Sequence, residues 1–344
     1  MSGCATAGSR WSGPSPPAAR PTDVLIVPEE VCRQVIGRAE AFGAVRDVFA
    51  AMARGEAQNF PVVREALGHA GALYGFKSGF DRSGMVLGVK SGGYWPGNAA
   101  RGLTNHQSAV ILFDPDSGRP TAMVGGNYLT ALRTAAASAV SIAHLARADA
   151  RVLGIVGAGF QSAFQIRAAL DQRPFARILA WNYHPEMLPG LAAAVADTGV
   201  PFESVPLAEL GAAADVIITI TSSFAPSLLR EHVRPGTHLA CMGTDTRGKQ
   251  EVEPALLAAA SVFTDEVAQA VSIGESQHAV AAGLLAEDAI TPLGAVVAGT
   301  HPGRRSEDEI TLYDGTGIGL QDLAVASAAA RLAAARGLAQ EVAW

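Results

Sequence analysis

Cysteine is scarce in this sequence, and the patterns that tie cysteines together are missing. The three cysteines, Cys4, Cys32 and Cys241, are odd in number and lack the spacing of a metal site or a CxxC motif. They indicate free thiols of a reducing compartment, which favours the cytoplasm, and the sequence predicts no metal site.

Long apolar runs and clusters of basic residues are also missing. No stretch approaches the ~20 apolar residues of a membrane span. Residues 1–22 are rich in Ser, Gly, Pro and Ala and lack the apolar segment of a signal peptide, so we expect a flexible tail there. The formal net charge of −6 is spread along the chain without Lys and Arg clustered among aromatics. Neither a membrane nor a nucleic acid is an expected partner.

Apolar residues, by contrast, make up 49% of the 344 residues, enough length and apolar content for about two domains. The first part shows a helix near residues 28–54, a long Ala-rich helix over Tyr128–Ala146, and turn residues at 114–118 that predict a hairpin. Its short apolar runs predict a mainly antiparallel α+β domain, with strands at Leu73–Phe76, Met85–Val89, Ala109–Phe113 and Ala122–Val124.

From residue 150 onward strands and helices alternate, which predicts a parallel sheet with covering helices. The expected strands are Val152–Val156, Ile178–Trp181, Asp215–Thr221, His238–Met242 and Val262–Thr264. The last segment, Ile310–Tyr313 and a helix over Leu320–Arg336, is expected to rejoin the first domain. The predicted fold class is therefore α/β, with a Rossmann domain over 131–309 and a discontinuous α+β domain over 23–130 and 310–344.

The strongest local signal is a glycine-rich turn between a strand and a helix. The strand Val152–Val156 runs directly into a G-x-G-x-x-S pattern, and a helix follows. The first glycine allows the tight turn, the second lets the backbone approach a pyrophosphate, and the small third residue allows close helix packing. The pattern predicts a dinucleotide site that includes Gly157, Ala158, Gly159, Phe160, Gln161 and Ser162.

Two further strand ends favour the same cofactor. Asn182 stands where an acid would bind the adenosine ribose. The segment Ala180–His184 around it contains no Arg that could bind a 2′-phosphate, which favours NAD(H) over NADP(H). Thr221 and Ser222 end a buried strand, where α/β sheets bind ligands. Contact with the cofactor is slightly favoured over the alternative that their hydroxyls cap the strand end.

Three segments bring charges into glycine-rich or apolar surroundings, at Lys90, Arg133 and Asp245. Each also has an ordinary explanation, since Arg133 could be a cation on a helix surface and Asp245 a turn residue.

Together these segments resemble the ornithine cyclodeaminase/μ-crystallin family. The similar motifs, in order, are Gly88-Val-Lys90, Thr104-Asn-His106-Gln107, Leu129-Thr-Ala-Leu-Arg133-Thr134, the glycine turn, Gly243-Thr-Asp245-Thr-Arg-Gly-Lys249-Gln-Glu251 and Asp314-Gly-Thr-Gly317-Ile-Gly-Leu-Gln-Asp322. The resemblance implies a homodimer whose discontinuous domain forms the substrate pocket and the dimer interface.

The resemblance also implies roles for single residues. Lys90 and Arg133, with Arg64 as a third cation, would hold a substrate α-carboxylate, and Asp245 would exchange a proton with the α-nitrogen. Thr316 and Gly317 would lie near the nicotinamide and the substrate, and Thr134, Met242 and Gly243 would contact the cofactor.

One position departs from the cyclodeaminases. They need an acid to hold a distal amine, and at the corresponding position this chain has Lys77, which suits a second carboxylate instead. The residues of several motifs most resemble those of the branch that contains iminosuccinate reductases and ectoine-utilisation proteins. We therefore expect NADH-dependent reduction of iminosuccinate to aspartate, with hydride reaching C2 and Asp245 protonating the imine nitrogen.

Two alternatives stay open. One is an ornithine cyclodeaminase or a reductase of cyclic imines such as pyrroline- or piperideine-2-carboxylate. The other is a μ-crystallin-like protein that binds a dinucleotide and a carboxylated ligand without turnover.

Overall fold

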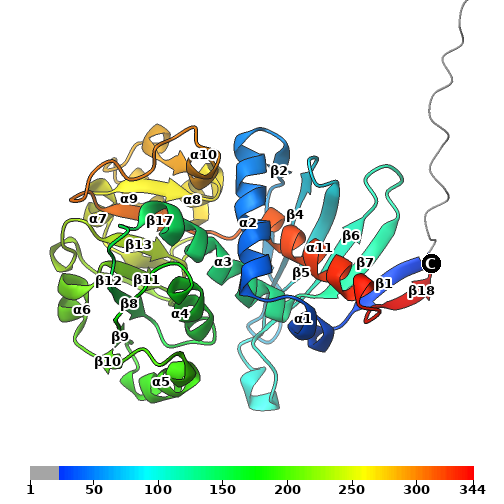
Figure 1. Ribbon diagram of the computed structural model, residues 1–344, viewed down its shortest axis with the longest axis horizontal. Helices are drawn as coiled ribbons and strands as arrows, with labels where there is room; N and C mark the ends of the chain where they lie inside the picture. Colours follow the sequence, from blue (N-terminus) through cyan, green and yellow to red (C-terminus); the bar gives the residue numbers. More distant parts are fainter. Residues whose placement is uncertain (1–22) are drawn as a thin grey trace, which may run out of the picture.

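The structure, a computed structural model, describes residues 23–344 and contains two large sheets, each with its own covering helices (Figure 1). We call them the N-terminal unit and the Rossmann unit. The tail expected over residues 1–22 lies outside the described residues. No helix of residues 23–344 is long and apolar enough to cross a membrane.

The N-terminal unit is built on a sheet with the strand order β18-β1-β7-β6-β5-β4-β2, and β3 also pairs with β4. All pairs in it are antiparallel except β1 with β7. Its elements are β1 (Asp23–Val27), α1 (Glu29–Val35), α2 (Arg38–Ala53), β2 (Ala57–Asn59), β3 (Val63–Ala66), β4 (Leu73–Asp81), β5 (Val86–Tyr94), β6 (His106–Phe113), β7 (Pro120–Gly125), α11 (Gly319–Ala335) and β18 (Gln340–Ala343).

Side chains alternate across this sheet as a half-covered sheet requires. On β6, Val110 and Leu112 are buried on the side where α11 packs, whereas Ile111 and Phe113 on the other side are partly exposed. The hairpin predicted at residues 114–118 is confirmed, because it joins the antiparallel pair β6 and β7.

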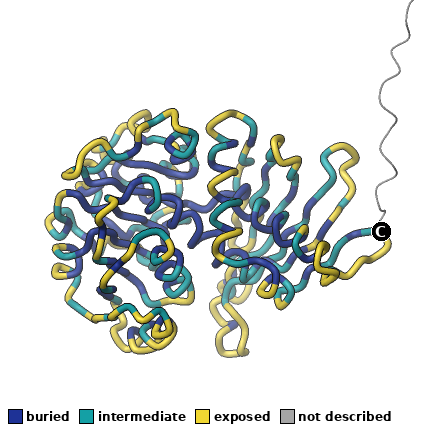
Figure 2. Tube along the Cα trace, in the orientation of Figure 1, coloured by how far each residue is buried: buried dark blue, intermediate teal, exposed yellow. Residues whose placement is uncertain are grey.

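One buried helix lies between the units. This helix, α3 (Asn127–Leu145), confirms the predicted Ala-rich helix, and its trace runs largely buried between the two units (Figures 1 and 2). Its many small side chains allow elements of both units to pack closely on it. The Glu29 carboxylate accepts hydrogen bonds from the backbone N–H groups of Asn127 and Tyr128, which stabilises the helix N-terminus.

The prediction of one helix over residues 28–54 was wrong. The segment forms α1 and α2, because the backbone is extended at Ile36 and Gly37 between them. A side-chain pattern of helical period does not show such a short break.

The Rossmann unit has a wholly parallel sheet with the strand order β10-β9-β8-β11-β13-β17-β15-β16, and β12 pairs with β14 beside it. Its elements are β8 (Val152–Val156), α4 (Ser162–Leu170), β9 (Arg177–Trp181), α5 (Leu188–Val195), β10 (Phe202–Ser204), α6 (Leu207–Ala213), β11 (Val216–Thr219), β12 (Phe224–Leu228), β13 (His238–Cys241), β14 (Gln250–Val252), α7 (Pro254–Ala258), β15 (Ser261–Thr264), α8 (Val267–Ile273), α9 (Ser276–Ala281), β16 (Thr291–Pro292), α10 (Leu293–Val297) and β17 (Thr311–Asp314). Residues 23–344 also form short 3₁₀ helices. One lies in the N-terminal unit, η1 (Ala99–Arg101), and the others lie in the Rossmann unit: η2 (Pro185–Met187), η3 (Ala196–Thr198), η4 (Arg230–His232) and η5 (Glu287–Ala289).

The placement of the segment Ile310–Tyr313 in the first domain is corrected by the structure. The strand β17 lies between β13 and β15 in the Rossmann sheet, and all four of its residues are buried. The chain returns to the N-terminal unit only afterwards, with α11. An apolar strand pattern reports burial but does not say which sheet the strand joins.

Candidate functional site

A cavity of about 960 Å³ is lined by residues of both units and of α3. The ends of the Rossmann strands meet it from one side and the strands β4 and β5 from the other. All the predicted site residues line it except Ser162: Arg64, Lys77, Lys90, Arg133, Thr134, Gly157, Ala158, Gly159, Phe160, Gln161, Asn182, Thr221, Ser222, Met242, Gly243, Asp245, Thr316 and Gly317. Ser162 is fully buried at the start of α4, which fits close helix packing rather than contact with a ligand.

The glycine turn between β8 and α4 has the backbone that a dinucleotide site needs. Gly157 has φ +119°, and a Cβ there would lie 2.4 Å from the carbonyl oxygen of Ile220, so only glycine fits. A Cβ on Gly159 would meet no protein atom within 4 Å. Gly159 therefore leaves open space at the N-terminus of α4, where the helix dipole favours a pyrophosphate.

This geometry makes Gly159→Val a sharp test of the cofactor site. The branched side chain has room in the protein but occupies the space where phosphate must approach the backbone. We expect NADH affinity to fall at least about tenfold, which corresponds to ~1.4 kcal/mol, while the melting temperature stays near that of the parent. Fluorescence titration with NADH and thermal unfolding measure the two quantities. Parent-like NADH binding by the folded variant would refute the assignment.

Other loops around the cavity are held by buried carboxylates. Glu251 accepts hydrogen bonds from the backbone N–H groups of Thr221 and Gly243 and from the Thr221 hydroxyl. Asp265 does the same for the backbone N–H groups of Thr316 and Gly317. These loops are therefore fixed in place before any ligand binds. The Asn182 amide donates to the carbonyl oxygen of His184, and its contact with ribose stays a prediction.

The cations of the N-terminal unit are clustered across neighbouring strands. Lys77 on β4 and Lys90 on β5 stand directly opposite each other, so their side chains share one face of the sheet. Arg133 on α3 and Lys90 both donate to Oδ1 of the buried Asp322 on α11, at 3.0 and 3.2 Å. The Lys77 ammonium donates to the carbonyl oxygen of Gly317 at 2.5 Å, so it faces the cavity rather than solvent.

Burial and this clustering lower the pKa of both lysines. Burial lowers the pKa of Lys90 to about 7, with Arg133 and Lys77 adding to the effect and Asp322 opposing it. Burial and then the charge of Arg133 lower the pKa of Lys77 as well. Like charges forced together in this way are stabilised when an anion lies between them.

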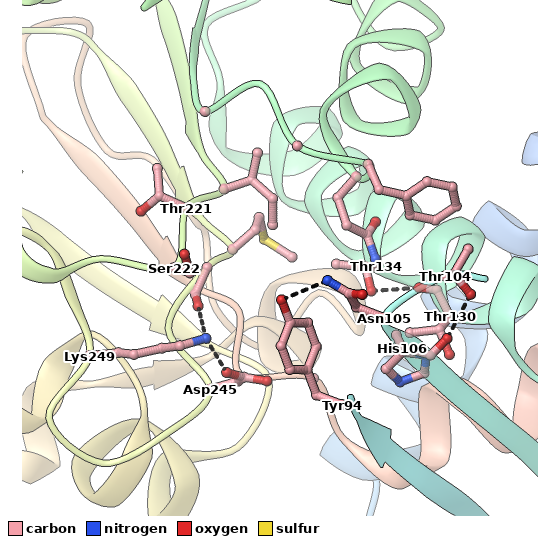
Figure 3. A pocket seen from close by; sticks show the side chains of 18 of the residues that line it. Tyr94, Thr104, Asn105, His106, Thr130, Thr134, Thr221, Ser222, Asp245 and Lys249 are labelled. Atoms are coloured by element: carbon pink, nitrogen blue, oxygen red, sulfur yellow. Dashed lines mark hydrogen bonds and ion pairs between the residues drawn. The ribbon is translucent and has the colours of Figure 1, made fainter. Parts of the chain in front are cut away.

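Asp245 faces the cation cluster from the Rossmann unit, and both of its carboxylate oxygens are occupied. Oδ1 accepts from Lys249 at 2.8 Å (Figure 3). Oδ2 accepts from Arg64 on β3 at 3.0 Å. Burial alone would raise the pKa of Asp245, but Lys249, Arg64 and Lys77 together hold it well below its usual value. The carboxyl group is therefore ionised in this geometry and carries no proton to donate.

The sequence profile of the ornithine cyclodeaminase/mu-crystallin family matches residues 24–333. This chain belongs to that family. Family membership, expected from the separate motifs, is thereby confirmed, as is the α/β fold class with a Rossmann-type unit.

Several members of the family are similar over almost the whole chain. The iminosuccinate reductase of Paracoccus denitrificans is 61% identical over 319 residues, which are 93% of this chain and 99% of that protein. The crystal structure of that reductase in complex with NAD+ matches with a TM-score of 0.90, again over 93% and 99% of the two chains. An archaeal alanine dehydrogenase dimer with bound NAD has a TM-score of 0.88 at 30% identity, over 93% of this chain and 99% of its own.

A third similar structure contains both a dinucleotide and an amino acid. The Delta(1)-pyrroline-2-carboxylate reductase of Thermococcus litoralis, in complex with NADH and L-proline, has a TM-score of 0.88 at 25% identity and covers 93% of this chain.

The sequence did not identify four polar residues of the site: His106, Lys249, Asp265 and Asp322. His106 and Lys249 line the cavity, whereas Asp265 and Asp322 act from behind it. Three of the four stand in quoted motifs, but His106, Lys249 and Asp265 are not unusual for their own segments. Asp322 alone had a local signal, as an acid in an Ala-rich helix that packs on a sheet.

Proposed function

We propose that this protein is an NADH-dependent imino acid reductase that converts iminosuccinate to aspartate. The observation that carries the proposal is the cluster of Lys77, Lys90 and Arg133, which faces the same cavity as a glycine turn suited to a dinucleotide. The similarity to an iminosuccinate reductase supports the same substrate and cofactor.

The charges of the cavity suit a dicarboxylic substrate. Five lysine and arginine side chains line it, and Asp245 is the one acid among the lining residues of 23–344. Arg133 uses two N–H groups on Asp322 and Gln321, which fixes its guanidinium while leaving further donors for a carboxylate. We assign the α-carboxylate to Lys90 and Arg133 and the second carboxylate to Lys77.

The cofactor belongs on the opposite wall. The glycine turn would hold the pyrophosphate, Asn182 the ribose, and the residues around Thr316 the nicotinamide end. When bound, NADH supplies hydride to C2 of the imine and leaves as NAD+. Asn182 in place of an acid, with no Lys or Arg in Ala180–His184, supports NAD(H) over NADP(H).

An absorbance assay tests substrate and cofactor together. Oxaloacetate and ammonia form iminosuccinate in solution, so the purified protein should oxidise NADH in the presence of both and produce aspartate. Omitting ammonia controls for reduction of the keto acid itself. Turnover of ornithine to proline and ammonia, or of a cyclic imine, with none of iminosuccinate would assign the protein to another activity of the family. No NADH oxidation with any imine would favour a binding protein.

We also propose that the open face of the N-terminal sheet pairs with a second copy of the chain. Phe76 and Met123 are 42% and 46% exposed on this face, beside the half-buried Val89 and Ile111. Within residues 23–344 no helix covers it, since α11 packs on the other side. The family structure of an alanine dehydrogenase dimer supports this pairing. The free, buried thiols of Cys32 and Cys241 support a cytoplasmic location.

Met123→Glu should disrupt this pairing, because a charge would have to be buried in an apolar interface. We expect the mass measured by analytical ultracentrifugation to fall from dimer to monomer, with an unchanged circular dichroism spectrum. Met123→Leu keeps the apolar surface and should stay dimeric. If the glutamate variant keeps the mass of the parent, this face is not the interface.

A further inference from the structure

The chain uses lysine at only three positions, and all three line the cavity. Of its 26 basic residues, only Lys77, Lys90 and Lys249 are lysines, so the other 23 are arginines. Arginine thus serves at every cationic position away from the cavity. A compact ammonium group differs from a guanidinium in shape and in how readily its pKa shifts, so this distribution points to a specific use of each lysine. Lys77 and Lys90 have roles in the proposed function, but Lys249 does not yet have one.

The surroundings of Lys249 aim its ammonium at Asp245. Its backbone is fixed by hydrogen bonds, one from its N–H to Thr246 and one between its carbonyl oxygen and the His278 ring. Its side chain is only 18% exposed. The ammonium donates to Asp245 Oδ1 at 2.8 Å and to the carbonyl oxygen of Gly243 at 3.2 Å, so Asp245 is its only charged partner in residues 23–344 (Figure 3).

The other cations at Asp245 come from the opposite unit. Arg64 lies on β3, and its Nη1 also donates to the backbone oxygen of Asp245 and to the Thr246 hydroxyl. Lys77 on β4 faces Asp245 as the third cation. Both of these residues are also placed to receive substrate carboxylates, whereas Lys249 belongs to the loop of Asp245 itself. Lys249 is therefore the partner that remains on Asp245 when a dianion draws Arg64 and Lys77 away.

We propose that Lys249 is a positioning residue that holds the Asp245 carboxylate in place, so that the ionised Asp245 binds the substrate nitrogen as a protonated iminium instead of giving it a proton. This inference rests on the proposed reduction of iminosuccinate. It revises the expected role of Asp245 as an acid.

The chemistry balances without a proton from Asp245. Addition of hydride to C2 of the iminium moves the C=N π-electron pair onto nitrogen and gives a neutral amine. The amine takes one proton from water and leaves as the ammonium group of aspartate. Asp245 stabilises the positive charge of the iminium before the step and can accept a hydrogen bond from the amine after it.

The sign of the pH effect follows from the charges around Asp245. Lys249, Arg64 and Lys77 lower the pKa of Asp245 against the effect of burial, so the ionised form is present at neutral pH and is lost only at strongly acid pH. An opposite charge within ~4–6 Å lowers the pKa of a carboxyl group by about 1–3 units. Removing the charge of Lys249 should raise the pKa of Asp245 by a similar amount, which leaves the carboxyl group ionised at neutral pH. The loss expected from removing Lys249 is therefore one of position rather than of charge.

The test compares Lys249→Met, which keeps the length but removes the charge, with Lys249→Arg, which keeps the charge. Arg247→Met is the matched control, because Arg247 is an exposed cation of the same loop that does not line the cavity. The readout is binding of L-aspartate to the enzyme–NADH complex, followed by NADH fluorescence between pH 5 and 9. This complex does not turn over. Succinate, which lacks the nitrogen, serves as the control ligand.

We expect Lys249→Met to lose at least about tenfold in affinity for aspartate throughout this pH range, because the carboxylate is no longer held in place, while succinate binding changes little. Lys249→Arg should move the curve back toward the parent, and Arg247→Met should match the parent. The kcat/KM for iminosuccinate should follow the same order at neutral pH. An unchanged aspartate curve in Lys249→Met would overturn the proposal, as would higher activity of that variant, which is the result expected if Asp245 worked as an acid. A parent that does not reduce iminosuccinate would instead refute the proposed function.

Discussion

Asp245→Asn is expected to lower kcat/KM for iminosuccinate by ~10²–10⁴-fold, the range for loss of a charged or proton-exchanging group at a reacting centre. The asparagine keeps the shape, but its single oxygen can replace only one of the two carboxylate oxygens that accept from Lys249 and Arg64, and its amide N–H₂ meets the other cation. It removes the negative charge that faces the substrate nitrogen in the proposed complex. Steady-state kinetics with NADH, oxaloacetate and ammonia measure the loss.

Two controls make this result specific. Asp308→Asn removes an exposed acid of the Rossmann unit and should behave as the parent. NADH affinity of Asp245→Asn should stay within about tenfold of the parent, since the glycine turn is unchanged. Parent-like turnover by Asp245→Asn would exclude Asp245 from the chemistry.

Lys77→Glu is the second variant with a large expected effect, because it tests how the substrate is chosen. A charge-assisted hydrogen bond to a second carboxylate contributes roughly 1.5–3 kcal/mol, or on the order of 10–100-fold in affinity. The glutamate adds repulsion to this loss. We therefore expect kcat/KM for iminosuccinate to fall by at least that factor and far more than kcat/KM for iminopyruvate, which has a single carboxylate.

The neutral variant Lys77→Met separates the two contributions. It should lose the hydrogen bond without the repulsion and so lie between the parent and Lys77→Glu. Equal losses on both imines would show that Lys77 does not bind the second carboxylate. The structure already argues against Lys77 as an ordinary solvated strand residue, because its ammonium faces Gly317 and Arg133 inside the cavity.

Patterns within one segment of the sequence were interpreted correctly. The strand, glycine turn and helix at residues 152–170 are continuous in the chain, and the torsion angles and close contacts that require glycine act over a few residues. The Ala-rich helix α3 and the hairpin between β6 and β7 were predictable for the same reason. The motifs also placed Lys90, Arg133 and Asp245 on one cavity, but through their resemblance to a family rather than through their own chemistry.

Relations between distant segments were not open to this kind of inference. The apolar strand β17 looks the same whether it pairs with β13 or with the other sheet, so its place in the Rossmann unit followed only from the assembled fold. Asp322 likewise gains its role through Lys90 and Arg133, which lie 232 and 189 positions earlier in the chain.

The sequence by itself thus determined the glycine turn, many of the helices and strands and most of the charged residues of the cavity, because these depend on local backbone preferences and on recognisable motifs. The protonation state of Asp245 was decided only by tertiary structure. Its charge depends on burial, on Lys249 four residues away and on Arg64, which lies 181 positions distant on the opposite unit. The sequence does not show which groups surround an aspartate after folding. The burial and the nearby cations that set the pKa of Asp245 are therefore visible only in the folded protein.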